Sequence, residues 1–446
     1  MDEKNKKTDN KPFINETIRK KPINKRKLLW RLVLTAVSAV LFGVIACVTF
    51  LVMEPIIGGV ISPEKVQKIS FPEEEVPVEA LLTEESKAQK EEADKQEVLD
   101  AARKEAAREV EIAVKNDASE ESSLERYSRI YDELSTLAKD SQSYMVTVIA
   151  ANDATDWLAG TYETEQIFSG VIIADNGLQY FVLADLADRS ASRYTIRFYD
   201  GSYMERPVLR RDPQTGLAIF SIPKSGLPRN TLLTTNEAVL GNSSYTDLLG
   251  KPVIAVGSPQ GIAESVSYGT VTSENAQLRV TDGVYDVMLT DIAGSDQSSG
   301  VLIDLEGKIV GVITKSAQSV SSSGGTAAVG ISEIKTLMAK MSNDEQMVYL
   351  GVKGMAVTMQ AHEELQIPFG AYVTDVEVSS PAMQAGIRNA DIIVQIGDSS
   401  ISSFKELRTV LLTMSPGEEK NITIMRYDGQ QYQQIETQVM LQEASE

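Results

Sequence analysis

Three kinds of hydrophobic pattern follow one another along the chain. The first is a run of 22 residues without a charge, LVLTAVSAVLFGVIACVTFLVM, at 32–53. A helix of about 20 apolar residues is long enough to cross the hydrocarbon layer of a membrane. The run is longer than the apolar core of a signal peptide, and no small-residue cleavage site follows it. We therefore predict a single transmembrane helix at 32–53.

The charge distribution predicts how that helix is oriented. The net charge is −20, but residues 1–31 hold eleven Lys/Arg against four Asp/Glu, a balance of +7 that leaves −27 (−20 − 7) for the rest. Because basic flanks stay in the cytoplasm, residues 1–31 are predicted to be a cytoplasmic tail and the remainder extracytoplasmic. The acidic body argues against a nucleic-acid partner. Cys47, the only cysteine, lies inside the apolar run, which suits a disulfide-free bacterial envelope protein.

The second pattern is helical but only weakly apolar. Residues 54–83 mix Pro, Gly and acidic residues, as is typical of an extended linker. Residues 84–115 carry a thin, mostly Ala stripe, which predicts a solvated stalk helix, with a short coiled coil as the alternative. A better amphipathic helix is predicted from Leu124 to Leu137. Residues 54–139 are thus predicted to be a linker and helical stalk.

The third pattern, at 140–345, consists of short β-runs separated by turn residues, with NG and DG at hairpin positions. Such spacing predicts an all-β sandwich or a pair of barrels. A short helix at 331–341 is expected to close this unit. The predicted strands are YMVTVIA, FSGVIIAD, LQYFVLAD, RYTIRFY, SYMERPVLRR, LAIFSIP, KPVIAVG, ESVSYGTVTSE, VYDVMLTD, VLIDL, KIVGVIT and TAAVGIS.

Residues 346–443 are predicted to form a separate α+β unit. It opens with YLGVKGMAV and closes with a hairpin around a DG turn. Between them, SFKELRTVLLTM at 403–414 reads as a helix, with Ser403 and Glu406 in capping-box spacing.

Several sequence blocks, in this order and spacing, resemble the trypsin-like protease domain of the HtrA/DegP-type family. They are SGVIIADNGLQYFVLAD, RDPQTGLAIFSI, VIAVGSPQGIAESVSYGTV and TDIAGSDQSSGVLIDLEGKIVGVIT. The unit at 346–443 resembles the PDZ domain of that family, and the predicted anchor is similar to that of its membrane-tethered members. The resemblance implies two six-stranded β-barrels with a catalytic cleft between them, followed by a peptide-binding module.

The resemblance places the nucleophile position at Ser298. The family pattern Gly-Asn-Ser-Gly-Gly falls on DQSSG at 296–300. The family has a glycine two residues before the serine, and its N–H helps to bind the oxyanion; here Asp296 stands in its place. A carboxylate close to developing negative charge opposes the transition state.

The other two members of a serine triad are missing from the matching positions. The family's histidine falls on Ala187, or on Leu186 if the following loop is counted back, and its aspartate falls on Gly216. The only histidine of the chain, His362, lies in the second unit. Because a serine hydroxyl without a base is a poor nucleophile, we predict a pseudoprotease in which Ser298 is an ordinary turn residue.

Catalysis with an unorthodox base is the alternative. Asp185 or Lys315 could take the proton of Ser298, which would make the chain a serine endopeptidase. We interpret His362 as a solvated residue on a short helix rather than as a pH switch or ligand. The sequence shows no nucleotide-binding motif and no metal-ligand spacing, so we predict no cofactor and no metal.

The resemblance also implies a peptide groove in the second unit. Its carboxylate-binding loop would receive a peptide C-terminus, with the strand at 353–357 and the helix at 403–414 as groove walls. Expected partners are peptide C-termini or unfolded proteins; a groove filled by the protein's own chain is the alternative. A homotrimer or a mixed assembly with an active relative is also consistent with the resemblance. The implied loop residues are Tyr349, Leu350, Gly351 and Val352.

Overall fold

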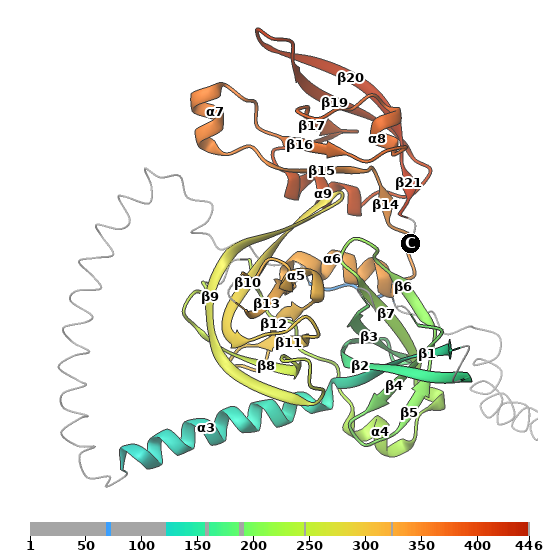
Figure 1. The fold of residues 1–446 in the computed structure, drawn as a ribbon, viewed down its shortest axis with the longest axis vertical. Coiled ribbons are helices and arrows are strands. Elements are labelled where there is room, and N and C mark those ends of the chain that lie inside the picture. Colours follow the sequence, from blue (N-terminus) through green and yellow to red (C-terminus); the bar gives the residue numbers. More distant parts are fainter. Residues whose placement is uncertain are drawn as a thin grey trace, which may run out of the picture. The chain divides into compact units, whose positions relative to one another are not determined.

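The computed structural model describes residues 68–72, 122–156, 160–186, 191–244, 247–322 and 324–444 (Figure 1). The predicted cytoplasmic tail, the apolar run at 32–53 and the stalk helix at 84–115 lie outside these residues. Within the described ranges, no helix combines the length and the apolar character needed to cross a membrane.

The first described helix, α3 (Ser123–Asp140), confirms the amphipathic helix predicted before the β-region. Ser122 caps it, and Glu125 completes a capping box by accepting the N–H of Ser122. Leu134 and Leu137, in its last turns, pack against the main core. Leu124 is 76% exposed, so only the C-terminal part of the apolar face is covered.

The first β-unit is a seven-stranded antiparallel sheet in the order β5-β4-β1-β2-β3-β7-β6. The resemblance implied six strands; the run SYMERPVLRR divides into two short strands because Pro207, which lacks an N–H, interrupts the ladder. Phe168, Leu183 and Phe220 are fully buried in its core. The strands are β1 (Met145–Asp156), β2 (Gly160–Asp175), β3 (Gln179–Asp185), β4 (Arg193–Phe198), β5 (Tyr203–Glu205), β6 (Val208–Arg211) and β7 (Leu217–Pro223).

The second β-unit is a closed barrel of six strands in the order β10-β13-β12-β11-β8-β9. A short helix, α4 (Arg229–Thr234), precedes it, α5 (Lys315–Gln318) lies within it, and α6 (Ile331–Ser342) closes it as predicted. The hairpin of β9 and β10 is longer than the sequence pattern suggested, and it turns at Thr281 and Asp282. The strands are β8 (Pro252–Ser258), β9 (Ser265–Val280), β10 (Gly283–Ala293), β11 (Ser299–Ile303), β12 (Ile309–Ile313) and β13 (Gly325–Gly330).

The third unit is the predicted α+β domain. Its sheet runs β15-β16-β17-β19-β20, so β15 is an edge strand, and β14 pairs separately with β21. Ser403 caps α9 as predicted, but the carboxylate of Glu406 accepts from Ser402, so the capping box with Ser403 is incomplete. The elements are β14 (Val348–Tyr349), β15 (Val352–Ala356), α7 (Met359–Leu365), β16 (Ala371–Val376), α8 (Pro381–Gln384), β17 (Ile392–Ile396), β18 (Ser399–Ser400), α9 (Phe404–Leu412), β19 (Glu419–Tyr427), β20 (Tyr432–Met440) and β21 (Gln442–Glu443).

Candidate functional site

The serine loop lies between β10 and β11, and the structure buries its serine. Ser298 has no exposed surface. Its Oγ donates a hydrogen bond to the carbonyl oxygen of Pro259 at 2.6 Å and accepts one from the N–H of Ser295 at 2.8 Å. A hydroxyl has a single proton to donate. Because that proton is bound to a main-chain carbonyl, the hydroxyl is not hydrogen-bonded to a general base.

A main-chain hydrogen bond within the loop also occupies the N–H of Ser298. The N–H of Ser298 donates to the carbonyl oxygen of Ser295 at 3.0 Å. In a trypsin-like enzyme the N–H of the nucleophilic serine is one of the donors that bind the oxyanion. Asp296, at the position of the family's other donor, has an exposed side chain. In this conformation Ser298 therefore offers no free oxyanion donor.

The positions expected for the base and the acid meet in the first β-unit. The N–H of Leu186 donates to the carbonyl oxygen of Gly216 at 2.8 Å, and the side chain of Leu186 is fully buried. Gly216 has a φ of +80°, a conformation that favours glycine over residues with a side chain. Ala187 lies outside the described residues. The structure thus brings the two positions together, and neither Leu186 nor Gly216 carries a proton-accepting side chain.

The alternative bases occupy structural positions at the boundary of the two β-units. Asp185 is 2% exposed, and its Oδ2 accepts the backbone N–H of Lys315 at 2.7 Å. This bond joins the end of β3 to the start of α5. The single proton of the Ser298 hydroxyl goes to Pro259, so neither Asp185 nor Lys315 accepts it.

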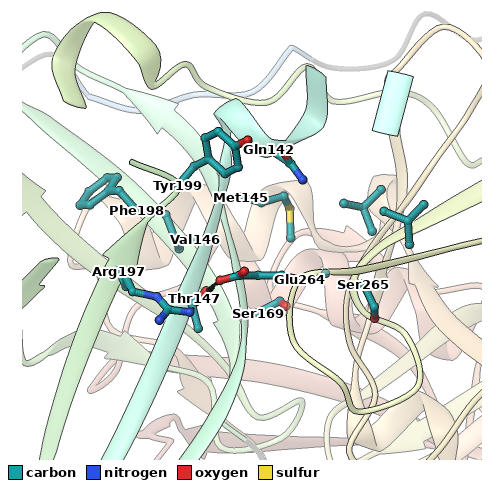
Figure 2. Close-up of a pocket in the computed structure, with 13 residues that line it drawn as sticks. Gln142, Met145, Val146, Thr147, Ser169, Arg197, Phe198, Tyr199, Glu264 and Ser265 are labelled. Carbon is teal, nitrogen blue, oxygen red and sulfur yellow. Dashed lines mark hydrogen bonds and ion pairs between the residues drawn. The ribbon is translucent and has the colours of Figure 1, made fainter. Parts of the chain in front are cut away.

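A pocket lies between β1, β4, β8 and the start of β9 (Figure 2). Glu264 reaches across it, accepting from Arg197 at 2.6 Å and from the hydroxyl of Thr147 at 3.2 Å. Ser298 and Gly216 are not among its lining residues. The pocket nevertheless borders the start of β11, because the N–H of its lining residue Ser169 donates to the hydroxyl of Ser299 at 3.1 Å.

The expected carboxylate-binding loop between β14 and β15 holds an internal carboxylate. Asp282, in the turn between β9 and β10, accepts from the N–H of Leu350 at 2.7 Å and from those of Gly351 and Val352 at 2.9 Å. The N–H of Asp282 donates to the carbonyl oxygen of Val352 at 2.7 Å. A groove filled by the chain itself was one of the two alternatives that the sequence left open, but no sequence pattern identified Asp282 as the occupant. A DG turn was the only signal there, and turns with this dipeptide occur in many hairpins.

The surroundings of this loop explain its geometry and its electrostatics. Gly351 has a φ of +88°, and a Cβ there would lie 2.2 Å from the Cβ of Ser380. Burial raises the pKa of Asp282 to about 6, against the lowering effect of the three N–H donors. Glu377 accepts from the hydroxyls of Thr281 and Tyr349, and these hydrogen bonds lower the pKa of Glu377.

His362 differs from its sequence interpretation. Its Nδ1 lies 2.8 Å from the carbonyl oxygen of Ile367, and its ring stacks on Phe369 with 4.0 Å between centroids. The residue is partly buried rather than fully solvated. It therefore packs the end of α7 onto the following loop.

The domain families that match this chain agree with the two kinds of unit. Residues 168–312 match the family described as "Trypsin-like peptidase domain", and residues 348–439 match "PDZ domain". Two curated relatives that match this chain are named as DegP-type serine endoproteases. The chain belongs to the HtrA-type family.

The individual relatives of this HtrA-type chain are distant. It is 29% identical to "Probable periplasmic serine endoprotease DegP-like" of Chlamydia muridarum, over 58% of this chain and 51% of that protein. It is 27% identical to "Periplasmic serine endoprotease DegP" of Escherichia coli K12, over 62% of this chain and 57% of that protein. The chain thus spans little more than half the length of these curated relatives.

A solved structure described as "HtrA-type protease AlgW with decapeptide" is also similar, at 21% identity and a TM-score of 0.49. The similarity covers 70% of this chain and 99% of the solved one.

Proposed function

We propose that this HtrA-type chain is a membrane-anchored, extracytoplasmic pseudoprotease that binds peptides or unfolded envelope proteins through its PDZ domain. The main support is that the hydroxyl of Ser298 is buried and donates a hydrogen bond to the carbonyl oxygen of Pro259. The proposed role is that of a scaffold or quality-control factor, as a homotrimer or in a mixed assembly with an active relative.

The chemistry of acyl transfer supports the absence of hydrolysis. The attacking serine must lose its proton to a base, and the histidine that serves in trypsin-like enzymes does not occur before residue 362. Without base and acid, only the oxyanion hole and substrate binding remain to accelerate the reaction. Here the N–H of Ser298 donates to the carbonyl oxygen of Ser295, so it is not free to stabilise an oxyanion.

The PDZ domain supports a binding role. Its loop presents three successive N–H groups to a single carboxylate, which is the arrangement that captures a peptide C-terminus. The edge strand β15 and the helix α9 would form the two groove walls, and their presence supports this role. The names of the relatives describe periplasmic proteins, which supports an extracytoplasmic location. The proposed anchor is the apolar run at 32–53.

A labelling experiment on the full-length chain tests the catalytic half of this proposal. A fluorophosphonate probe labels an activated serine, so we expect no labelling of Ser298 and no hydrolysis of casein. The controls are Ser298→Ala and Ser299→Ala, run beside an active DegP-type protease. Labelling that persists in Ser299→Ala but disappears in Ser298→Ala would show the alternative, a serine endopeptidase with an unorthodox base.

A further inference from the structure

The turn between β9 and β10 contacts the loop of the PDZ domain that the resemblance assigns to peptide binding. Both β9 and β10 contact β15, and β10 also contacts α9 (Figure 1); this strand and this helix are the groove walls that the resemblance implies. The barrel and the PDZ domain also fall within one compact unit, Gln67–Glu446. The occupant of the groove is therefore a defined segment of this chain.

The polar contacts of that turn reproduce those of a peptide terminus. The carboxylate of Asp282 receives the N–H groups of Leu350, Gly351 and Val352 at 2.7–2.9 Å. The main-chain N–H of Asp282 donates to Val352, on the edge strand, at 2.7 Å. A peptide that adds to the strand uses the same two features, a carboxylate in the loop and a main-chain bond to the edge.

An apolar side chain accompanies the carboxylate. Val284, two residues after Asp282, is 5% exposed. It belongs to the same buried apolar cluster as Leu350, Val352 and Phe404 of the PDZ domain. A peptide with a small branched residue at its C-terminus presents a comparable pair of groups, a carboxylate and an aliphatic side chain.

Charged contacts hold the hairpin against α9. Arg408 donates to Glu333 of α6 at 3.1 Å, and both side chains are more than nine-tenths buried. The guanidinium of Arg408 lies over the ring of Tyr285, 4.2 Å from its centroid. Lys405 pairs with Asp286 of β10 at 3.0 Å. The docked arrangement thus depends on several contacts beyond Asp282.

We propose that Asp282 is an internal competitor for peptide ligands, so that a peptide C-terminus binds only after the β9–β10 turn leaves the PDZ groove. This inference rests on the proposed function of the PDZ domain as a peptide binder. The internal carboxylate and the peptide carboxylate require the same N–H groups, so their binding is mutually exclusive. The apparent dissociation constant then equals the intrinsic one divided by the fraction of open molecules.

The test compares peptide affinity in the wild-type chain and in Asp282→Asn. The probe is a fluorescein-labelled ten-residue peptide that ends in valine, with the same peptide as a C-terminal amide for comparison. Asp282 has a φ of +60°, a conformation that asparagine also tolerates, so the variant should fold. Because an amide cannot satisfy three N–H donors as a carboxylate does, we expect at least about tenfold tighter binding of the free-acid peptide.

A matched control and a second measurement accompany the test. Asp291→Asn makes the same chemical change on β10, where the carboxylate accepts from the N–H and the hydroxyl of Thr270 within the barrel. It should bind the peptide as the wild type does. Hydrogen exchange of the amides of Leu350, Gly351 and Val352 reports the docked contact without any peptide, and it should become faster in Asp282→Asn alone.

The possible results separate the two proposals. Tighter binding together with faster exchange in Asp282→Asn supports the internal competitor. Equal affinities in wild type and Asp282→Asn overturn it and leave peptide binding by the PDZ domain intact. Faster exchange without binding of the free-acid peptide to either chain overturns both the competitor and the proposed binding function.

Discussion

Replacing Ser298 with alanine tests whether the serine loop has a structural or a catalytic role. The hydroxyl is fully buried and joins two parts of the chain by donating to Pro259 and accepting from Ser295. Alanine would leave both partners without these hydrogen bonds. A structural role therefore predicts that Ser298→Ala lowers the stability of the barrel.

The expected loss follows from the two hydrogen bonds. Each contributes about 0.5–1.5 kcal/mol net, and a buried partner left unpaired costs more than an exposed one. The bond to Ser295 is only partly buried, so we expect a total loss of about 2 kcal/mol. For a domain of about 200 residues, such a loss lowers the Tm by roughly 4–8 °C.

Thermal unfolding followed by circular dichroism measures this change. Ser319→Ala is the control, because Ser319 is exposed and a surface substitution changes stability by less than about 0.5 kcal/mol. An unchanged or raised Tm in Ser298→Ala would refute the structural role. Removal of a group held for catalysis commonly stabilises a fold, so that result would favour the endopeptidase.

Two further predictions concern the buried pair of Arg408 and Glu333 and the loop between β14 and β15. Glu333→Gln should lower the free energy of unfolding in urea by about 3 kcal/mol, because it leaves the buried Arg408 without its charged partner. Gly351→Ala should abolish binding of the valine-terminated peptide, measured by anisotropy, because its φ is +88° and its Cβ would lie 2.2 Å from a neighbouring carbon.

Local sequence signals predicted most elements of the described fold. Alternating apolar runs and the dipeptides NG and DG identified the strands, and Ser403 identified the start of α9. The C-terminal end of β9 was predicted too early, because its last residues, NAQLRV, include polar side chains in a strand that is only half buried. Pro207 divided one predicted strand in two, which its missing N–H explains.

The sequence by itself determined that the β-region at 140–345 contains no histidine, because the only histidine of the chain is at position 362. It also determined the order of the domains, which depends on patterns local to each segment. Only the tertiary structure decided which groups bind the hydroxyl of Ser298 and the N–H groups of the loop between β14 and β15. Ser298 and Pro259 are 39 residues apart, and Asp282 and Gly351 are 69 apart. Hydrogen bonds over such separations depend on how the β-units and the PDZ domain pack, and no local pattern encodes that packing.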